Sequence, residues 1–162
     1  RIAMLKRSEI PSYKESLFKE QQGLCALTGL PIDEISKAHL DHDHRLDGPS
    51  AGRCRGLLLG NANVLEGRLK HQFNRSGLAG QIDYIDFLKR LVSYLERDNT
   101  NRPRHPQMIP DLKKRFSRYN LSDMRQNLSE VHLETQGTKK ELQQRYAKYL
   151  KVQYGKDKEI RQ

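Results

Sequence analysis

The chain has 162 residues, of which 35% are apolar and none is tryptophan, and it carries a formal net charge of +10 with a pI near 9.7. That length supports one ordinary domain or two small ones, and the low apolar fraction argues against one large core. No apolar run approaches the roughly 20 residues that span a bilayer, so we expect no membrane segment. The excess of Lys and Arg favours a polyanionic partner such as nucleic acid, although a merely solvated basic surface has the same composition.

The N-terminal part of the chain predicts a helix over about residues 12–22. Ser12 would be its N-cap, and Glu15, three residues later, would complete a capping box. Leu17 and Phe18 fall on the face of this helix that we expect to contact a core.

Two short strands and a second helix follow. Residues 38–41 and 54–59 predict the strands, and the spacing of apolar residues after Gly60 predicts the helix. Asn63 and Glu66 then lie one turn apart on one helical face, because residues three apart are neighbours on a helix.

The sequence predicts a further helix over residues 82–97 that is apolar around most of its girth. Such a helix is buried on several sides. In so small a chain the simplest cover is the same helix of a second copy, in a two-fold dimer. A central helix in the core of a monomer is the alternative.

The C-terminal segment, residues 103–162, contains 14 Lys or Arg against 7 Asp or Glu, so it carries +7 of the net charge of +10. We expect three short helices here, over about residues 111–119, 122–130 and 139–149. Thr138 and Glu141 form the pattern of a capping box for the last of them. The expected core residues of this segment are Leu121, Met124, Leu128, Leu133, Leu142, Tyr146 and Leu150.

Residues 39–44 contain three histidines and two aspartates within six positions. A carboxylate is a hard oxygen ligand that suits Mg²⁺ or Mn²⁺. A neighbouring imidazole is well placed to take a proton from water near pH 7. Together with Asn63 and Glu66, this cluster predicts metal-assisted hydrolysis.

A strand that ends in Asp-His, a loop, a second strand and a helix with Asn near its start resemble the ββα-metal nucleases, also called HNH or His-Me finger nucleases. A longer set of matching residues resembles the phage recombination endonuclease VII family, whose members resolve Holliday junctions. These matches are residues 39–44, 48–49, 52, 55–58, 63, 66–67, 70–71, 73–78, 105–106 and 116–118. The resemblance covers nearly the whole chain.

The resemblance implies a fold as well. We expect a mainly α chain around a small ββα-metal nuclease core, an intertwined helical homodimer and a small C-terminal helical module. The nuclease domain with its N-terminal helix would occupy residues 1–80, and the dimerisation helix with its linker residues 81–102. A basic DNA-binding module would occupy residues 103–162.

The resemblance also implies roles for the residues of the site. Asp41 and Asn63 would hold one Mg²⁺ or Mn²⁺ ion, and His42 would be the general base. His44 and Glu66 match further active-site positions, with phosphate contact, metal support or orientation as their roles.

Other residues near the site have less definite roles. For His39 and Asp43, a structural hydrogen bond is as plausible as an active-site role. The candidate DNA contacts of the nuclease part are Arg53, Arg55, Arg68 and Lys70.

The sequence departs from the family at its structural zinc site, which the family builds from two CxxC pairs. The matching positions here hold Cys25, Thr28, Leu59 and Ala62. Leu59 and Ala62 offer no zinc ligand, so we expect no structural zinc and instead apolar packing around Cys25. The only other cysteine is Cys54, and so few cysteines in this arrangement favour a reducing compartment.

Residues 121–124 and 137–142 resemble the SAP-type DNA-binding motif, a helix, an extended loop and a helix. In this motif Lys139, Lys140 and Arg145 would contact backbone phosphates. A solvated charged surface remains the alternative for each of them.

We therefore interpret the chain as a metal-dependent DNA endonuclease that resolves four-way junctions and other branched DNA by paired symmetric nicks. A homodimer would supply the two active sites, and the resemblance places such a protein in the host bacterial cytoplasm. The first alternative is a sequence-guided or non-specific HNH nicking endonuclease. The second is a non-catalytic, architectural junction-binding protein.

Overall fold

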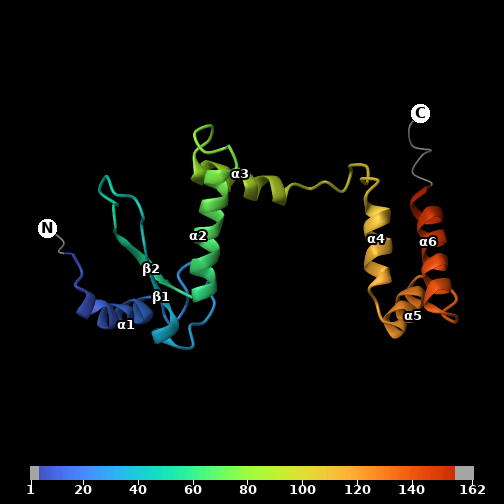
Figure 1. Cartoon of the computed structure of the whole chain (residues 1–162), viewed down its shortest axis with the longest axis horizontal. Helices are drawn as coiled ribbons and strands as arrows, with labels where there is room; N and C mark the ends of the chain where they lie inside the picture. The colour runs from blue at the N-terminus through green and yellow to red at the C-terminus, as the bar shows by residue number, and fades with distance from the viewer. Residues whose placement is uncertain (1–3, 156–162) are drawn as a thin grey trace. The chain divides into compact units, whose positions relative to one another are not determined.

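The computed structural model describes residues 4–155, and the chain in it is mainly helical with one two-stranded antiparallel sheet (Figure 1). The expectation of a mainly α chain is confirmed. The chain divides into two compact units, Arg1–Arg97 and Asp98–Gln162, and each has its own apolar core. Residues 1–3 of the expected nuclease domain and residues 156–162 of the expected C-terminal module lie outside the described residues.

The first unit begins with a short 3-10 turn, η1 (Arg7–Glu9), which leads directly into helix α1 (Ile10–Glu20). The prediction of Ser12 as N-cap is therefore wrong: Glu9 holds that position, and the Ser12 hydroxyl donates to the Glu9 carbonyl at 2.9 Å. Because η1 leads directly into the helix, α1 begins at Ile10, before Ser12. Leu17 is buried and Phe18 packs against the same core, as predicted.

The sheet consists of β1 (His39–His42) and β2 (Cys54–Leu58), preceded by the 3-10 turn η2 (Ile35–Lys37). The strands pair with Asp41 opposite Gly56 and His42 opposite Cys54, so the register is irregular between Asp41 and His42. The partners of these two consecutive residues skip Arg55, so the extra residue lies in β2, and such a bulge bends its strand and re-aims the side chain. The buried core under the sheet consists of Leu17, Cys25, Ile32, Ala38, Leu57, Leu58 and Ala62.

Helix α2 (Gly60–Arg75) begins directly after β2 and carries both Asn63 and Glu66, as predicted. Its last turn leads through a loop to α3 (Tyr84–Glu96), where the Asp83 carboxylate caps the helix by accepting from the backbone N–H groups of Ile85 and Asp86. None of the residues of α3 is buried in this single chain.

The second unit consists of α4 (Met108–Ser117), α5 (Leu121–Glu130) and α6 (Lys139–Gly155), and α6 packs against both other helices. The capping box is confirmed, because the Thr138 N–H donates to Glu141 Oε2 at 2.7 Å and the Glu141 N–H donates to Thr138 Oγ1 at 3.3 Å. The buried core is Phe116, Met124, Leu128, Leu142, Tyr146 and Leu150. It confirms most of the predicted set but not Leu121, which is 38% exposed.

No helix in the described part of the chain combines the length and the apolar character needed to cross a membrane.

Candidate active site

The candidate site is centred on Asp41, the one buried charged residue in residues 4–155, with 7% of its surface exposed. Both of its carboxylate oxygens accept hydrogen bonds from Arg55. Arg55 Nε donates to Oδ2 at 2.6 Å, and Nη2 donates to Oδ1 at 3.0 Å. The antiparallel register sets this contact, because Asp41 lies opposite Gly56, the neighbour of Arg55 in β2. Such a paired, charge-assisted contact fixes the plane of the carboxylate.

Arg55 also joins the sheet to α2. Its Nη2 atom lies 3.2 Å from Glu66 Oε1, so one guanidinium contacts carboxylates of both β1 and α2. The hydrogen bonds that Arg55 donates to Asp41 raise the pKa of Arg55, partial burial lowers it by less, and the charges of Asp41 and Glu66 raise it further. Arg55 is therefore a permanent cation between two candidate active-site carboxylates.

Asn63 lies in the first turns of α2, beside His39 at the start of β1. Asn63 Nδ2 and His39 Nδ1 are 3.4 Å apart. Gly60 permits the helix to start this close to the strand, since a Cβ atom there would be 3.3 Å from His39 Nε2. His39 thus has a structural contact that positions the predicted metal ligand Asn63.

The other two histidines of the cluster lie against each other. The ring centroids of His42 and His44 are 4.4 Å apart, with the planes tilted by 53°. The extra residue at the register irregularity is Arg55 of β2, so Asp41 and His42 stay consecutive in β1 and face opposite sides, Asp41 buried and His42 exposed. The structure therefore keeps the predicted general base at the end of β1, next to His44.

Asp43 organises the loop that follows. Its carboxylate accepts from the Arg45 N–H at 2.9 Å and from Arg45 Nη2 at 2.7 Å. The hydrogen bonds from Arg45 lower the pKa of Asp43 to about 2. The Asp43 N–H donates to the Arg53 carbonyl at 2.8 Å, which closes the base of the loop. These contacts favour the structural role for Asp43.

A metal would bind here through few protein ligands. In residues 4–155, no three His, Cys, Asp or Glu side chains are arranged to hold an ion. Mg²⁺, however, is commonly held by one or two protein oxygens together with several waters, and one carboxylate with one amide oxygen supplies that chemistry. Asp41 and Asn63 therefore fit such an ion in donor type, but one Asp41 oxygen would have to leave Arg55.

The remaining basic candidates differ in their surroundings. Arg53 Nε donates to the Pro49 carbonyl at 3.2 Å, and Arg68 is exposed on α2. In the second unit, Lys139 and Lys140 are exposed. Arg145 Nη1 donates to the carbonyls of Glu134 and Gln136 at 2.8 and 3.0 Å, so this guanidinium holds the loop before α6.

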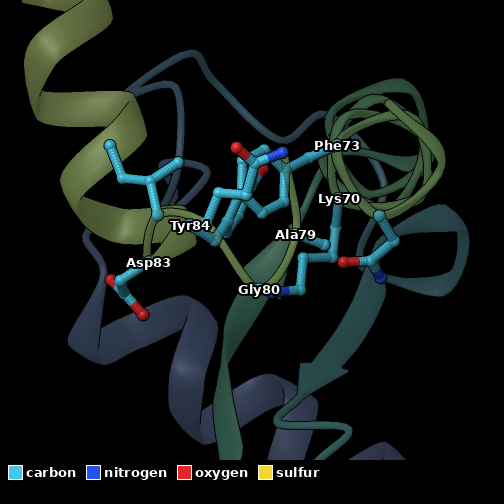
Figure 2. A pocket seen from close by; sticks show the side chains of 9 residues that line it. Lys70, Phe73, Ala79, Gly80, Asp83 and Tyr84 are labelled. Atoms are coloured by element: carbon cyan, nitrogen blue, oxygen red, sulfur yellow. The ribbon is translucent and has the colours of Figure 1, made fainter. Parts of the chain in front are cut away.

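Lys70 lies at a hollow of about 380 Å³ between α2 and α3 (Figure 2). Its ammonium is 4.3 Å from the centroid of the Tyr84 ring, a cation–π contact that limits where the lysine points. Burial raises the pKa of Tyr84, and the nearby negative charge of Glu66 raises it further. Tyr84, which the sequence marked only as an apolar helix position, thus joins the surroundings of Glu66.

The apolar packing expected around Cys25 is present in the first unit. Cys25 is buried in one cluster with Ala62, and Leu59 packs against it, as predicted. The Leu59 N–H donates to Cys25 Sγ at 3.4 Å. Burial raises the pKa of the Cys25 thiol, but the Thr28 hydroxyl and backbone N–H groups lower it by more.

One known family matches this chain. The family described as recombination endonuclease VII matches residues 3–97, more than half of the 162 residues, and that range includes α1, the sheet, α2 and α3. The name of the family implies a DNA endonuclease. The chain belongs to the recombination endonuclease VII family.

Proposed function

We propose that the protein is a metal-dependent endonuclease that resolves four-way junctions and other branched DNA by paired symmetric nicks. The observation that carries the proposal is the buried carboxylate of Asp41, held on β1 within reach of residues on α2, in a chain of an endonuclease family. A buried carboxylate that is paired and held in one orientation, close to other titratable side chains, is a candidate functional group.

In this proposal Asp41 and Asn63 hold one Mg²⁺ or Mn²⁺ ion, which would polarise the scissile phosphate and neutralise charge that develops on the leaving oxygen. His42 takes the proton from the attacking water. His44, whose ring lies 4.4 Å from that of His42, orients this imidazole or contacts the phosphate. In this proposal β1, β2 and α2 form a ββα-metal finger.

Arg55 and Glu66 act as positioning residues in the same proposal. The guanidinium fixes the Asp41 carboxylate and is itself held by Glu66 at 3.2 Å. With an ion bound, Arg55 would still be able to contact one Asp41 oxygen and Glu66, both of which it contacts in the structure. Its remaining N–H donors can then meet a DNA phosphate, the role expected for it from the sequence.

A homodimer would provide the two active sites that paired nicks need. Four large apolar side chains of α3 are between 53% and 69% exposed in the single chain: Ile85, Val92, Tyr94 and Leu95. Val64, Leu65 and Leu69 of α2 are also exposed. Exposed apolar surface on this scale supports an interface with another chain, and a second copy gives it a self-complementary partner.

DNA contacts would come from both units. Arg53, Arg68 and Lys70 are the candidates of the first unit, and Lys139 and Lys140 lie at the start of α6 in the SAP-like segment. Contacts to phosphates carry no base information, so the enzyme would recognise the shape of the junction. In this proposal residues 1–80 cut, residues 81–102 dimerise and residues 103–162 add affinity.

The test compares cutting of a synthetic four-way junction with cutting of a linear duplex, in Mg²⁺ and in EDTA. Asn63→Ala removes a proposed metal ligand, and Asn61→Ala is the matched control on the same helix, where Asn61 Oδ1 contacts only the neighbouring Ala62 N–H. Symmetric, metal-dependent cutting of the junction, lost in Asn63→Ala alone, is the expected result. Equal cutting of the linear duplex would instead support a nicking endonuclease, and binding without cutting an architectural protein.

A further inference from the structure

The second unit has a groove between α4 and α6 that the family match, which ends at residue 97, does not cover. The groove has a volume of about 580 Å³. Lys113 and Lys114 stand on its α4 wall, and Lys140 stands on its α6 wall. Its other lining residues are Phe116, Ser117, Gln143, Gln144, Tyr146 and Ala147.

The floor of the groove is rigid. The rings of Phe116 and Tyr146 stack at a centroid distance of 4.2 Å, and both residues belong to the buried core of the unit. Because the two walls are joined through this core, the helix positions that carry the lysines are fixed relative to each other. A preformed site of this kind loses less conformational entropy on binding than scattered surface lysines.

The charge of the groove is not neutralised by the protein. In the described part of the chain no carboxylate lies within ion-pair distance of Lys113, Lys114 or Lys140, and all four ion pairs found there belong to the first unit. The nearest acidic neighbour in sequence, Glu141, is used in the capping box with Thr138. Asp111 accepts a hydrogen bond from Gln107 at 3.2 Å.

The same face of α6 continues the positive charge along the groove. Lys140, Gln144, Ala147 and Lys151 are spaced by four, three and four residues, so they share one side of the helix. Lys151 is exposed. The result is a track with lysines on both walls and glutamine amides between them, which can meet successive phosphates of one DNA strand.

We propose that the α4–α6 groove binds the phosphate backbone of duplex DNA, as a second contact outside the active site. The proposal rests on the proposed function for the identity of the ligand, which would be an arm of the branched substrate. It differs from the SAP-like interpretation in its residues: Lys113, Lys114 and Lys140 make the contacts, whereas Lys139 lies outside the groove and Arg145 holds the loop. A bound phosphate backbone would supply the negative charge that the protein does not place beside these three lysines.

The test measures binding of the full-length chain to a synthetic four-way junction across a range of salt concentrations, in EDTA so that no cutting occurs. The groove variant is Lys113→Ala/Lys114→Ala/Lys140→Ala. The matched control is Arg102→Ala/Arg118→Ala/Lys148→Ala, which removes the same charge from exposed positions of the same unit outside the groove.

The groove variant should lower the slope of log K against log salt concentration by about 2 to 3, because each phosphate contact contributes about 0.9. Its affinity should fall on the order of 100- to 1,000-fold at 0.1 M salt by the same relation, taken from 1 M salt where the electrostatic contribution vanishes. The control variant should change both quantities much less, and a triple Lys→Arg groove variant should restore binding. An unchanged melting temperature in each variant verifies folding.

Equal losses in the groove variant and the control would overturn the proposal, since binding would then follow net charge alone. Unchanged DNA binding in the groove variant would also overturn it and would leave the groove to an acidic protein. Failure of the proposed function is a separate outcome. A chain that binds the junction through the groove but cuts nothing in Mg²⁺ or Mn²⁺ would refute the endonuclease and leave this inference standing.

Discussion

Substituting Arg55 should destabilise the first unit and change its response to metal. Arg55→Gln removes the cation from Asp41, whose side chain is 8% exposed, while that of Arg55 is 40% exposed. Unit charges about 3 Å apart attract by roughly 5 kcal/mol at an effective dielectric constant of about 20. Removing one partner of a fully buried pair costs about 3–5 kcal/mol. Because solvent screens the exposed part of Arg55, we expect a loss of about 1–3 kcal/mol.

Denaturant unfolding in EDTA measures this loss, and hydrogen exchange at the N–H groups of β1 and β2 assigns it to the first unit. A divalent ion should replace the missing positive charge beside Asp41. Saturating Mg²⁺ or Mn²⁺ should therefore stabilise Arg55→Gln more than the unchanged protein, in which the ion displaces part of an existing contact. Calorimetric titration with Mn²⁺ gives the ion affinities directly.

Arg45→Gln is the matched control, because Arg45, whose side chain is 67% exposed, pairs with the loop residue Asp43 at 2.7 Å. It should change neither the response to metal nor the exchange of the strands. The reasoning is refuted if Arg55→Gln unfolds at the same denaturant concentration as the unchanged protein and gains no more than it from metal.

Three further predictions concern other parts of the chain. Arg45 lowers the pKa of Asp43 from 3.8 to about 2, so the ion pair stabilises the loop above about pH 4 and is lost as the pH falls through 2. Arg45→Gln should therefore speed hydrogen exchange of the loop N–H groups above about pH 4, and unchanged exchange there would contradict this prediction. Leu142 is fully buried, so Leu142→Ala should destabilise the second unit by about 2–5 kcal/mol in denaturant unfolding. Leu121 is 38% exposed, so Leu121→Ala should cost clearly less, and similar losses would argue against the packing described. Val92→Glu should convert a dimer into a monomer in sedimentation experiments, and a dimer that persists would place the interface elsewhere.

The local parts of the site were predictable from the sequence. A short apolar stretch placed Asp41 on a strand, and the spacing after Gly60 placed Asn63 and Glu66 on one helix. Both inferences depend on side-chain periodicity within a few residues, which the sequence records directly. The Thr138 capping box was predictable for the same reason.

The contact between Asp41 and Arg55 was not predictable in this way. It joins residues 14 positions apart and depends on the register between β1 and β2, including the irregularity before His42. A shift of one residue would turn Arg55 to the other face of the sheet. Sequence spacing alone therefore suggested a DNA contact for Arg55, whereas the folded chain gives it two carboxylate partners.

Errors in the helices have similar causes. Ser12 was expected to cap α1, but the preceding turn η1 supplies Glu9 at that position. Phe116 was missing from the expected core of the second unit, because its burial depends on stacking against Tyr146 of a different helix. The α4–α6 groove has the same origin, since its lysines come from helices that are separate in the sequence.

The most direct test of paired cutting uses a supercoiled plasmid that extrudes a cruciform. The first nick releases the supercoiling and lets the cruciform be absorbed, so a linear product requires the second nick within the lifetime of the same complex. We predict linear DNA in Mg²⁺, none in EDTA, and none with Asn63→Ala. Nicked circles without linear product, or equal linearisation of a plasmid that lacks the cruciform, would contradict a dimeric junction-resolving endonuclease.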